Sequence, residues 1–191
     1  MKRIVVACIL LSLFVFGACP VCGAYGITTE RQDWLHDTAD ALRAMGVSED
    51  SEEIKSLQRL WWAEQEDLDI IAKTVMHEAD PAYCEWEHSL SVAVVILNRV
   101  ASPYFKGDTV KEIVAAPGQY LKAYTYGFEN TTELCYLVAK AAKDGDHNVP
   151  ADAFWQDTNR QGCYVWKEFL LDTGWYKSTT YICCGIPGVK S

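Results

Sequence analysis

Basic residues are scarce in this chain. Lys and Arg together number 17 against 26 Asp and Glu, which leaves a formal net charge of -9. A protein that binds nucleic acid needs Lys and Arg to neutralise phosphates, so this balance argues against a nucleic-acid partner. It does not exclude a neutral or weakly acidic polymer such as a polysaccharide.

The chain also lacks internal repeats, low-complexity segments and an apolar run long enough for a comfortable membrane span. Its apolar run at residues 4–18 is 15 residues long and follows two basic residues. This pattern is typical of an export signal. We expect residues 1–24 to be that signal and the protein to be extracellular or in the cell envelope. A lipid-modified Cys19 is one alternative and would supply a membrane anchor; an uncleaved anchor helix is another.

The cysteine count leaves disulfide pairing open. Cleavage before Tyr25 leaves an odd number of cysteines, five, whereas a chain that starts at Cys19 keeps six others. Export permits disulfides, but spacing assigns no pairs, and the alternative is that several are buried thiols.

Hydrophobic periodicity predicts a series of helices and few strands. The expected helices are 28–46, one that begins at 51, 67–79, 85–101, 109–115 and 130–143. From Ala151 onward the pattern is aromatic and rich in turns, with one or two short strands around 154–155 and 164–166. The sequence therefore predicts an α+β fold that is mainly helical, with a small β element.

Glu78 is the first candidate for a catalytic residue. It lies near the end of an apolar helical stretch, at the margin of the stripe that contains Ile71 and Val75. Partial burial there would raise the pKa of its carboxyl, and an acid that keeps its proton near neutral pH can protonate a leaving oxygen. Glutamates at helix margins more commonly face solvent or pair with a base, so position alone does not establish catalysis.

Four segments together carry a family resemblance. They are Ala-Lys-Thr-Val-Met-His-Glu-Ala at 72–79, Ser-Val-Ala-Val-Val-Ile-Leu-Asn-Arg-Val at 91–100, Ala-Pro-Gly-Gln-Tyr at 116–120, and the weaker pair 139–145 and 153–156. In this order and at these spacings the segments resemble the SleB/CwlJ-type cell wall hydrolases, which include spore cortex-lytic enzymes. The resemblance covers roughly residues 67–157, about half of the chain.

The resemblance implies a lysozyme-like domain that cleaves the peptidoglycan glycan backbone at N-acetylmuramic acid, with Glu78 as its essential acid. We expect no metal, no cofactor and a monomer. The domains would be the signal at 1–24, an N-terminal helical segment at 25–66, the catalytic domain at 67–170 and a C-terminal tail at 171–191.

The chain departs from the family pattern in two places. The turn after Ala79 is longer than the family's, which leaves a second acid undecided between Glu85 and Glu87, and the segment 181–187 lacks the family's His. A glycoside hydrolase needs a second carboxylate. A lytic transglycosylase does not, because the muramic acid's own hydroxyl closes a 1,6-anhydro ring. We therefore favour a lytic transglycosylase that uses Glu78 as acid and then base.

Candidate substrate-binding residues follow from the same segments. The resemblance places Asn98 and Arg99 near the cleft floor, and Gln119 stands on a Pro-Gly turn where its amide could bind a sugar. The aromatic candidates for stacking on sugar rings are Trp155, Tyr120, Phe154 and Tyr124. Structural roles are the alternative for each: Arg99 could bind helix carbonyls or an acid, Asn98 could cap its helix, and Gln119 could stabilise its turn.

Three other functions stay open. A thiol amidase or peptidase would use Cys84 with His88 or His147. A zinc enzyme would use His77, Cys84 and His88, although His77 has no His four residues later, as a metallopeptidase helix would. A domain that binds peptidoglycan without cleaving it is the third alternative.

Overall fold

The computed structural model describes residues 27–120, 131–172, 174 and 176–188. The expected signal, Cys19 and Tyr124 lie outside the described residues. No helix in the described part of the chain is long and apolar enough to cross a membrane.

The chain divides into two compact units between Glu66 and Asp67. That boundary falls inside α3 (Glu52–Ala79), a single helix of 28 residues where two helices were expected. The stretch contains no Gly or Pro, and the linking residues Ala63 to Glu66 are good helix formers, so nothing in the sequence interrupts the helix. The predicted boundary between the N-terminal segment and the catalytic domain lies at the same position.

The first unit pairs α2 (Glu30–Ala44) with the first half of α3. Thr29 caps α2 through a capping box with Gln32. The buried apolar side chains of the unit are Leu35, Ala39, Leu42, Ile54, Leu57 and Trp61. These residues recur with helical spacing on both helices, which explains why the two helices pack along their length.

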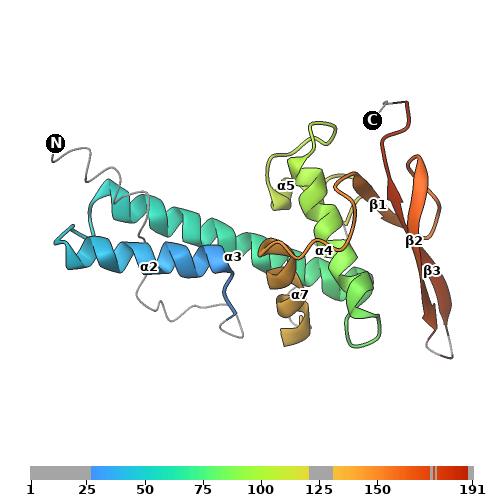
Figure 1. The fold of residues 1–191 in the computed structure, drawn as a ribbon, viewed down its shortest axis with the longest axis horizontal. Coiled ribbons are helices and arrows are strands. Elements are labelled where there is room, and N and C mark those ends of the chain that lie inside the picture. Colours follow the sequence, from blue (N-terminus) through green and yellow to red (C-terminus); the bar gives the residue numbers. More distant parts are fainter. Residues whose placement is uncertain (1–26, 121–130, 173, 175, 189–191) are drawn as a thin grey trace. The chain divides into compact units, whose positions relative to one another are not determined.

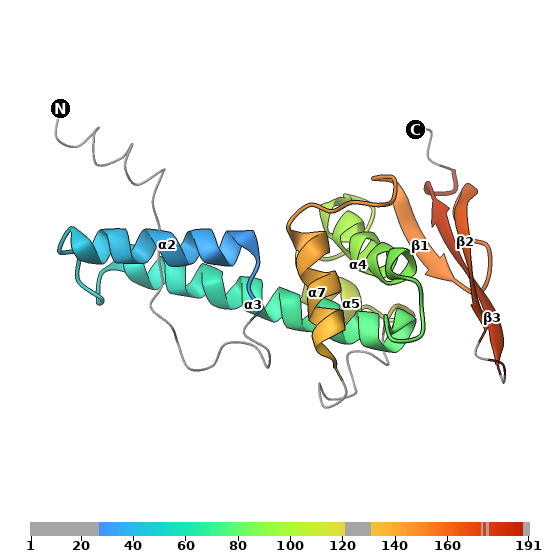
Figure 2. The ribbon, with the colours of Figure 1, turned by 60° about the horizontal axis from the view of Figure 1, so that its bottom comes forward.

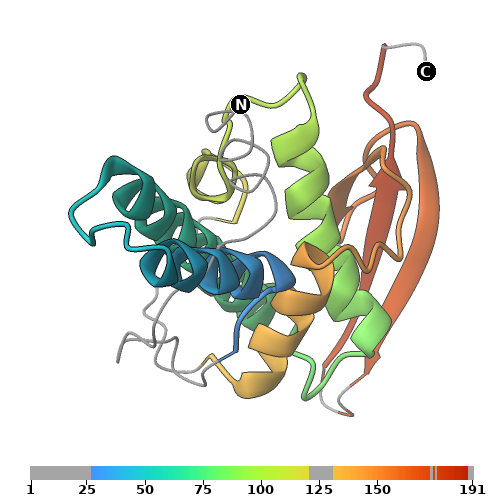
Figure 3. The same ribbon diagram turned by 60° about the vertical axis from the view of Figure 1, so that its left-hand side comes forward.

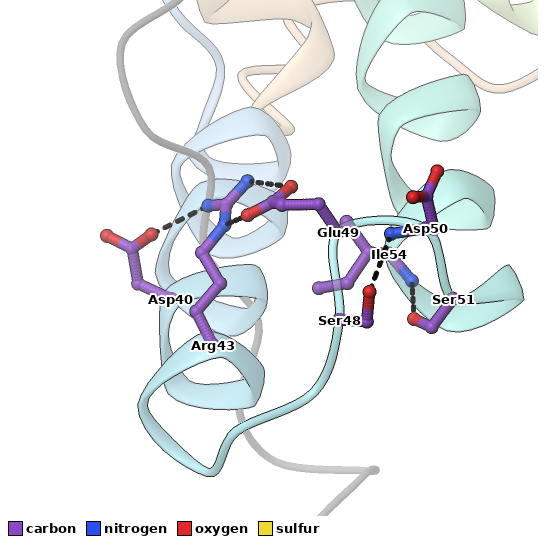
Figure 4. Close-up of polar contacts among 7 residues, drawn as sticks. All are labelled: Asp40, Arg43, Ser48, Glu49, Asp50, Ser51 and Ile54. Atoms are coloured by element: carbon purple, nitrogen blue, oxygen red, sulfur yellow. Dashed lines mark hydrogen bonds and ion pairs between the residues drawn. The ribbon is translucent and has the colours of Figure 1, made fainter.

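A short polar turn joins α2 to α3 (Figure 4). The guanidinium of Arg43 donates to Asp40 at 2.6 Å and to both carboxylate oxygens of Glu49. This contact raises the pKa of Arg43 and lowers that of Glu49. The hydroxyl of Ser51 accepts from the amide of Ile54 at 3.2 Å and satisfies one of the free N–H groups at the start of α3.

The second unit is built around α4 (Trp86–Ala101), whose buried residues surround almost the whole helix. This helix contacts α5 (Val110–Ala115), α7 (Glu133–Lys143) and strand β1 (Ala153–Asp157). Figure 3 shows α4 between α7 and the sheet. Because α4 packs against three other elements, an apolar run with almost no polar face folds here as a largely buried helix.

The sheet has three antiparallel strands in the order β1-β3-β2, with β2 at Tyr164–Asp172 and β3 at Lys177–Cys184 (Figures 1 and 2). The prediction of a mainly helical α+β fold with a small β element is therefore confirmed. The prediction of a C-terminal tail from 171 onward was wrong, because β3 is the central strand. Its last residues, Ile182 to Cys184, are completely buried.

Candidate functional site

A pocket of about 280 Å³ lies in the second unit, where the ends of two helices approach strand β1. Glu78 lines it from the last turn of α3, and Arg99 lines it from the last turn of α4. The loop residues 118–120, residues 155–158 at the end of β1, and Gln161 complete the described lining. Segments far apart in the sequence thus contribute to one cavity.

Glu78 lines the pocket but its side chain is exposed. The apolar stripe predicted beside it is buried, with Leu68, Ile71 and Val75 fully covered. The expected burial of Glu78 itself was wrong. Helix α3 ends one residue later, at Ala79, so no further turn of the helix covers the carboxyl. The side chain is exposed and lines the pocket.

Tyr120 lines the pocket and feels the charges of both Arg99 and Glu78. Burial raises the pKa of its phenol most strongly, the positive charge of Arg99 lowers it, and the charge of Glu78 raises it. The side chain is only 4% exposed, and its hydroxyl has no hydrogen-bond partner among the residues that the structure describes. A buried hydroxyl without a partner is costly, so this oxygen is a candidate contact for a ligand that reaches the floor.

Arg99 is a buried cation, 3% exposed, and holds the pocket together. Its Nε donates to the carbonyl oxygen of Phe154 at 2.5 Å, and its Nη1 donates to Oε1 of Gln119. The guanidinium carbon lies over the rings of Phe105, Tyr120 and Trp155, between 5.3 and 5.8 Å from their centroids. Cation–π contact and hydrogen bonds together compensate the loss of water around the charge.

The contact with Arg99 fixes the orientation of Gln119. Its carbonyl oxygen is used by the guanidinium, so its NH2 group is the end left for a ligand. Gly118, with φ of 76°, permits the turn that brings the amide to the pocket. Both predicted roles of Gln119, in structure and in binding, are compatible with this geometry.

Trp155 presents its ring to the same pocket. Its Nε1 donates to the carbonyl oxygen of Gly185 at 2.9 Å, and its ring meets Phe105 edge-on at 5.8 Å. Gly162 lies so close that an added Cβ would be 2.8 Å from Cδ1 of Trp155. The indole is therefore held in one orientation by its neighbours.

Sequence reasoning missed Gln156, Asp157, Thr158 and Gln161, all of which line the pocket. Asp157 is the last residue of β1, and its carboxylate accepts hydrogen bonds from the amide of Asn159 at 2.8 Å and from Nε2 of Gln161 at 2.5 Å. The polar run that directly follows Trp155 was the available signal. Polar residues that directly follow a candidate stacking residue are expected to line the same site.

Three predicted site residues lie elsewhere. Asn98 donates to the carbonyl oxygens of Pro150 at 2.9 Å and Ala153 at 3.1 Å, which ties α4 to the start of β1. Glu85 is the exposed N-cap of α4, and Glu87 pairs with Lys167 on β2. The structure places none of the three in the lining of the pocket.

The thiol and zinc interpretations find little support in the geometry. Burial raises the pKa of the Cys84 thiol, which disfavours the reactive thiolate. His88 is buried with its ring stacked on Phe169 at 4.6 Å, and burial lowers its pKa to about 4. The described residues include no group of three or more His, Cys, Asp or Glu that could hold a metal ion.

A family model described as Cell Wall Hydrolase matches residues 86–181, which is half of the chain and includes every described pocket residue except Glu78. The chain belongs to the cell wall hydrolase family. This confirms the resemblance, and membership of the family supports a role in the breakdown of peptidoglycan. No curated protein and no solved structure matches the chain. Glu78 precedes the matched segment, so its role in this cell wall hydrolase is argued from the pocket alone.

Proposed function

We propose that this cell wall hydrolase cleaves the glycan backbone of peptidoglycan at N-acetylmuramic acid, with Glu78 as the general acid. The observation that carries the proposal is the shared pocket. It combines one carboxyl at a helix end with an aromatic ring and an amide donor, which are the groups that a sugar-cleaving site needs. Because peptidoglycan lies outside the membrane, export directed by residues 1–24 is part of the proposal.

The position of Glu78 favours its neutral form when substrate is bound. It stands in the last turn of α3, where the free carbonyl groups of a helix carry partial negative charge and disfavour a second negative charge. A glycan strand seated in the pocket would also remove water from the carboxyl. Both effects keep the proton available for the glycosidic oxygen.

The remaining pocket residues suit a sugar ring. Trp155 offers an apolar face to the C–H side of a hexose, and the NH2 group of Gln119 can donate to a hydroxyl or to an N-acetyl oxygen. The guanidinium of Arg99 orients Gln119 by a hydrogen bond and contacts the three aromatic rings that surround it. The floor is therefore preorganised, which reduces the cost of ordering it on binding.

The reaction that we propose is lytic transglycosylation. Glu78 donates its proton to the bridging oxygen while the bond from this oxygen to C1 of the muramoyl residue breaks. The 6-hydroxyl of the same muramoyl residue then bonds to C1 and transfers its proton to the Glu78 carboxylate. The product is a 1,6-anhydromuramoyl end, no water is consumed, and the acid is restored.

Mass spectrometry of digested peptidoglycan tests this proposal. The full-length protein should produce fragments that end in anhydromuramoyl residues, and Glu78→Gln should reduce their formation at least about a thousandfold, because an amide cannot act as the acid. Glu85→Gln is the matched control, since it changes an exposed glutamate outside the pocket, and it should leave the yield unchanged.

Other products would contradict the proposal in distinct ways. Reducing muramic acid ends would replace transglycosylation by hydrolysis, and free stem peptides would identify an amidase. If wild-type protein and Glu78→Gln pellet equally with peptidoglycan and neither yields fragments, the domain is a binding module.

A further inference from the structure

We propose that Asp157 is a second catalytic carboxylate, which stabilises the positive charge that develops on the sugar ring; this inference rests on the proposed glycan cleavage. Among the described residues that line the pocket, Glu78 and Asp157 carry the carboxyl groups and Arg99 is the cation. Glu78 comes from the helical wall and Asp157 from the end of strand β1. A ring bound in a cavity of about 280 Å³ would have both groups close to it.

The charges of the pocket show what a second carboxylate would contribute, although ring closure by the 6-hydroxyl does not require one as nucleophile or base. An acid must be neutral to donate a proton, so before reaction Glu78 contributes no charge. Without the carboxylate of Asp157, Arg99 would then leave the described lining with a net positive charge. The transition state of glycoside cleavage is oxocarbenium-like and is itself cationic, so a positive pocket would destabilise it. The carboxylate of Asp157 balances Arg99 and makes the site suitable for a cation.

Local contacts hold the Asp157 carboxylate in place. Oδ1 accepts from the amide of Asn159 at 2.8 Å and Oδ2 accepts from Nε2 of Gln161 at 2.5 Å. Gly162 follows with φ of 67°, and an added Cβ there would lie 2.6 Å from the carbonyl oxygen of Cys184, so the loop sits tightly against β3. A fixed charge costs no reorganisation when the transition state forms.

Asp157 forms no bond to the sugar in this scheme. The proton leaves Glu78 for the bridging oxygen, the bond from C1 to that oxygen breaks, and the 6-hydroxyl closes the ring as described above. Asp157 lowers the energy of the state in which the charge at C1 and the ring oxygen is largest. The expected effect of its removal is therefore on kcat rather than on KM.

A structural role is the competing explanation, because Asp157 also closes a turn. Asp172 at the end of β2 provides the matched control: it accepts from the amide of Gly174 at 3.0 Å, two residues ahead, as Asp157 does from Asn159. Asn keeps the side-chain oxygen that such a turn requires. Asp157→Asn and Asp172→Asn thus make the same chemical change in two similar turns, one inside the pocket and one outside it, and Asp172→Asn additionally breaks an exposed ion pair with Lys177.

The test measures kcat and KM of the full chain on soluble glycan strands prepared from purified peptidoglycan. Asp157→Asn should lower kcat about a hundredfold or more, with KM within threefold of wild type, as expected for loss of one fixed charge at a transition state. Asp172→Asn should change neither value more than threefold. The kcat of Asp157→Glu should be at least tenfold higher than that of Asp157→Asn, because Glu restores the charge.

The inference fails if Asp157→Asn retains more than a third of the wild-type kcat, or if it raises KM instead. If Asp157→Asn does not fold, Asp157→Glu decides. Because Asp157→Glu displaces the carboxylate, its kcat should lie clearly below the wild-type value while its KM is unchanged. A wild-type kcat for this variant would overturn the inference. Absence of any glycan product from the wild-type protein would instead refute the proposed function.

Discussion

Arg99 is the residue on which most of the pocket depends. A buried guanidinium is tolerated only when its charge and its donors find partners. Here three aromatic rings surround it, and the carbonyl oxygens of Phe154 and Gln119 accept from it. One side chain therefore positions both the amide donor and the aromatic surface that we assign to sugar binding.

Two substitutions at Gln119 separate its binding role from its structural role. Gln119→Ala removes both the acceptor for Arg99 and the NH2 group, whereas Gln119→Glu keeps the acceptor and replaces the NH2 donor by a carboxylate oxygen. If the NH2 group binds sugar, both variants should raise KM for soluble glycan strands about five- to tenfold, which corresponds to about one hydrogen bond.

The measurement is a steady-state titration together with a thermal melt. Gln119→Glu should melt at or above the wild-type temperature because it pairs a carboxylate with Arg99. A wild-type KM for Gln119→Glu together with a raised KM for Gln119→Ala would mean that Gln119 only supports Arg99.

Sequence alone identified Glu78, Arg99, Gln119, Tyr120 and Trp155, each of which lines the pocket. It did not identify Asp157, because the polar run after Trp155 does not by itself show which neighbours a strand end will have once the strands pair. It also placed Glu78 in a buried setting, since helical periodicity predicts which face is apolar but not where neighbouring elements stop covering it. The role of Asn98 was also not predictable from local pattern, because its hydrogen-bond partners lie more than 50 residues away in sequence.

At the scale of elements, the sheet and the loop between β1 and β2 form one wall of the site. Gly162 lies near the end of that loop with φ of 67°, directly beside Trp155 and the carbonyl oxygen of Cys184. Residues with a side chain rarely adopt such a backbone, and here there is also no room for one. The glycine thus fixes the distance between the loop that carries Gln161 and the indole.

Gly162→Ala should therefore damage both stability and activity. The strained backbone and the collision together should cost about 2–3 kcal/mol, which would lower Tm by about 4–10 °C. Activity should also fall, because Gln161 and Trp155 must move apart. Gly145→Ala is the control, since Gly145 has φ of 98° but open space around it, and it should lose about 1 kcal/mol with no change in kcat. Equal losses in the two variants would show that the close packing at Gly162 is unimportant.

The helices were predicted more successfully than the strands. Long apolar periodicity identified α4 to within one residue of its observed start, whereas β3 was missed. The first half of β3 is Lys-Ser-Thr-Thr, which gives no alternation of apolar and polar residues. Its burial comes from pairing with a neighbour on each side, a long-range property that local pattern does not contain.

At the scale of the whole molecule, stability should depend on one buried imidazole in the second unit. His88 on α4 stacks against Phe169 on β2 and is 4% exposed. Its Nε2 has no hydrogen-bond partner among the described residues. Burial lowers the pKa of His88 to about 4, because the charged form would lose its water without gaining a partner.

The direction of the resulting pH dependence follows from linkage. In the unfolded chain His88 takes up a proton below about pH 6.5, whereas in the folded protein it does so only near pH 4. The stability that neutral His88 contributes is complete above about pH 6.5 and is lost as the pH falls towards 4. The loss should reach about 3 kcal/mol.

Thermal melts of the wild-type protein and of His88→Phe between pH 7.5 and pH 4 test this prediction. Phe preserves the stacked ring against Phe169 and cannot be protonated, so the variant should lose clearly less stability over this range than the wild type. If His88→Phe and wild type lose stability in parallel as the pH falls, other groups cause the acid sensitivity and the buried imidazole does not.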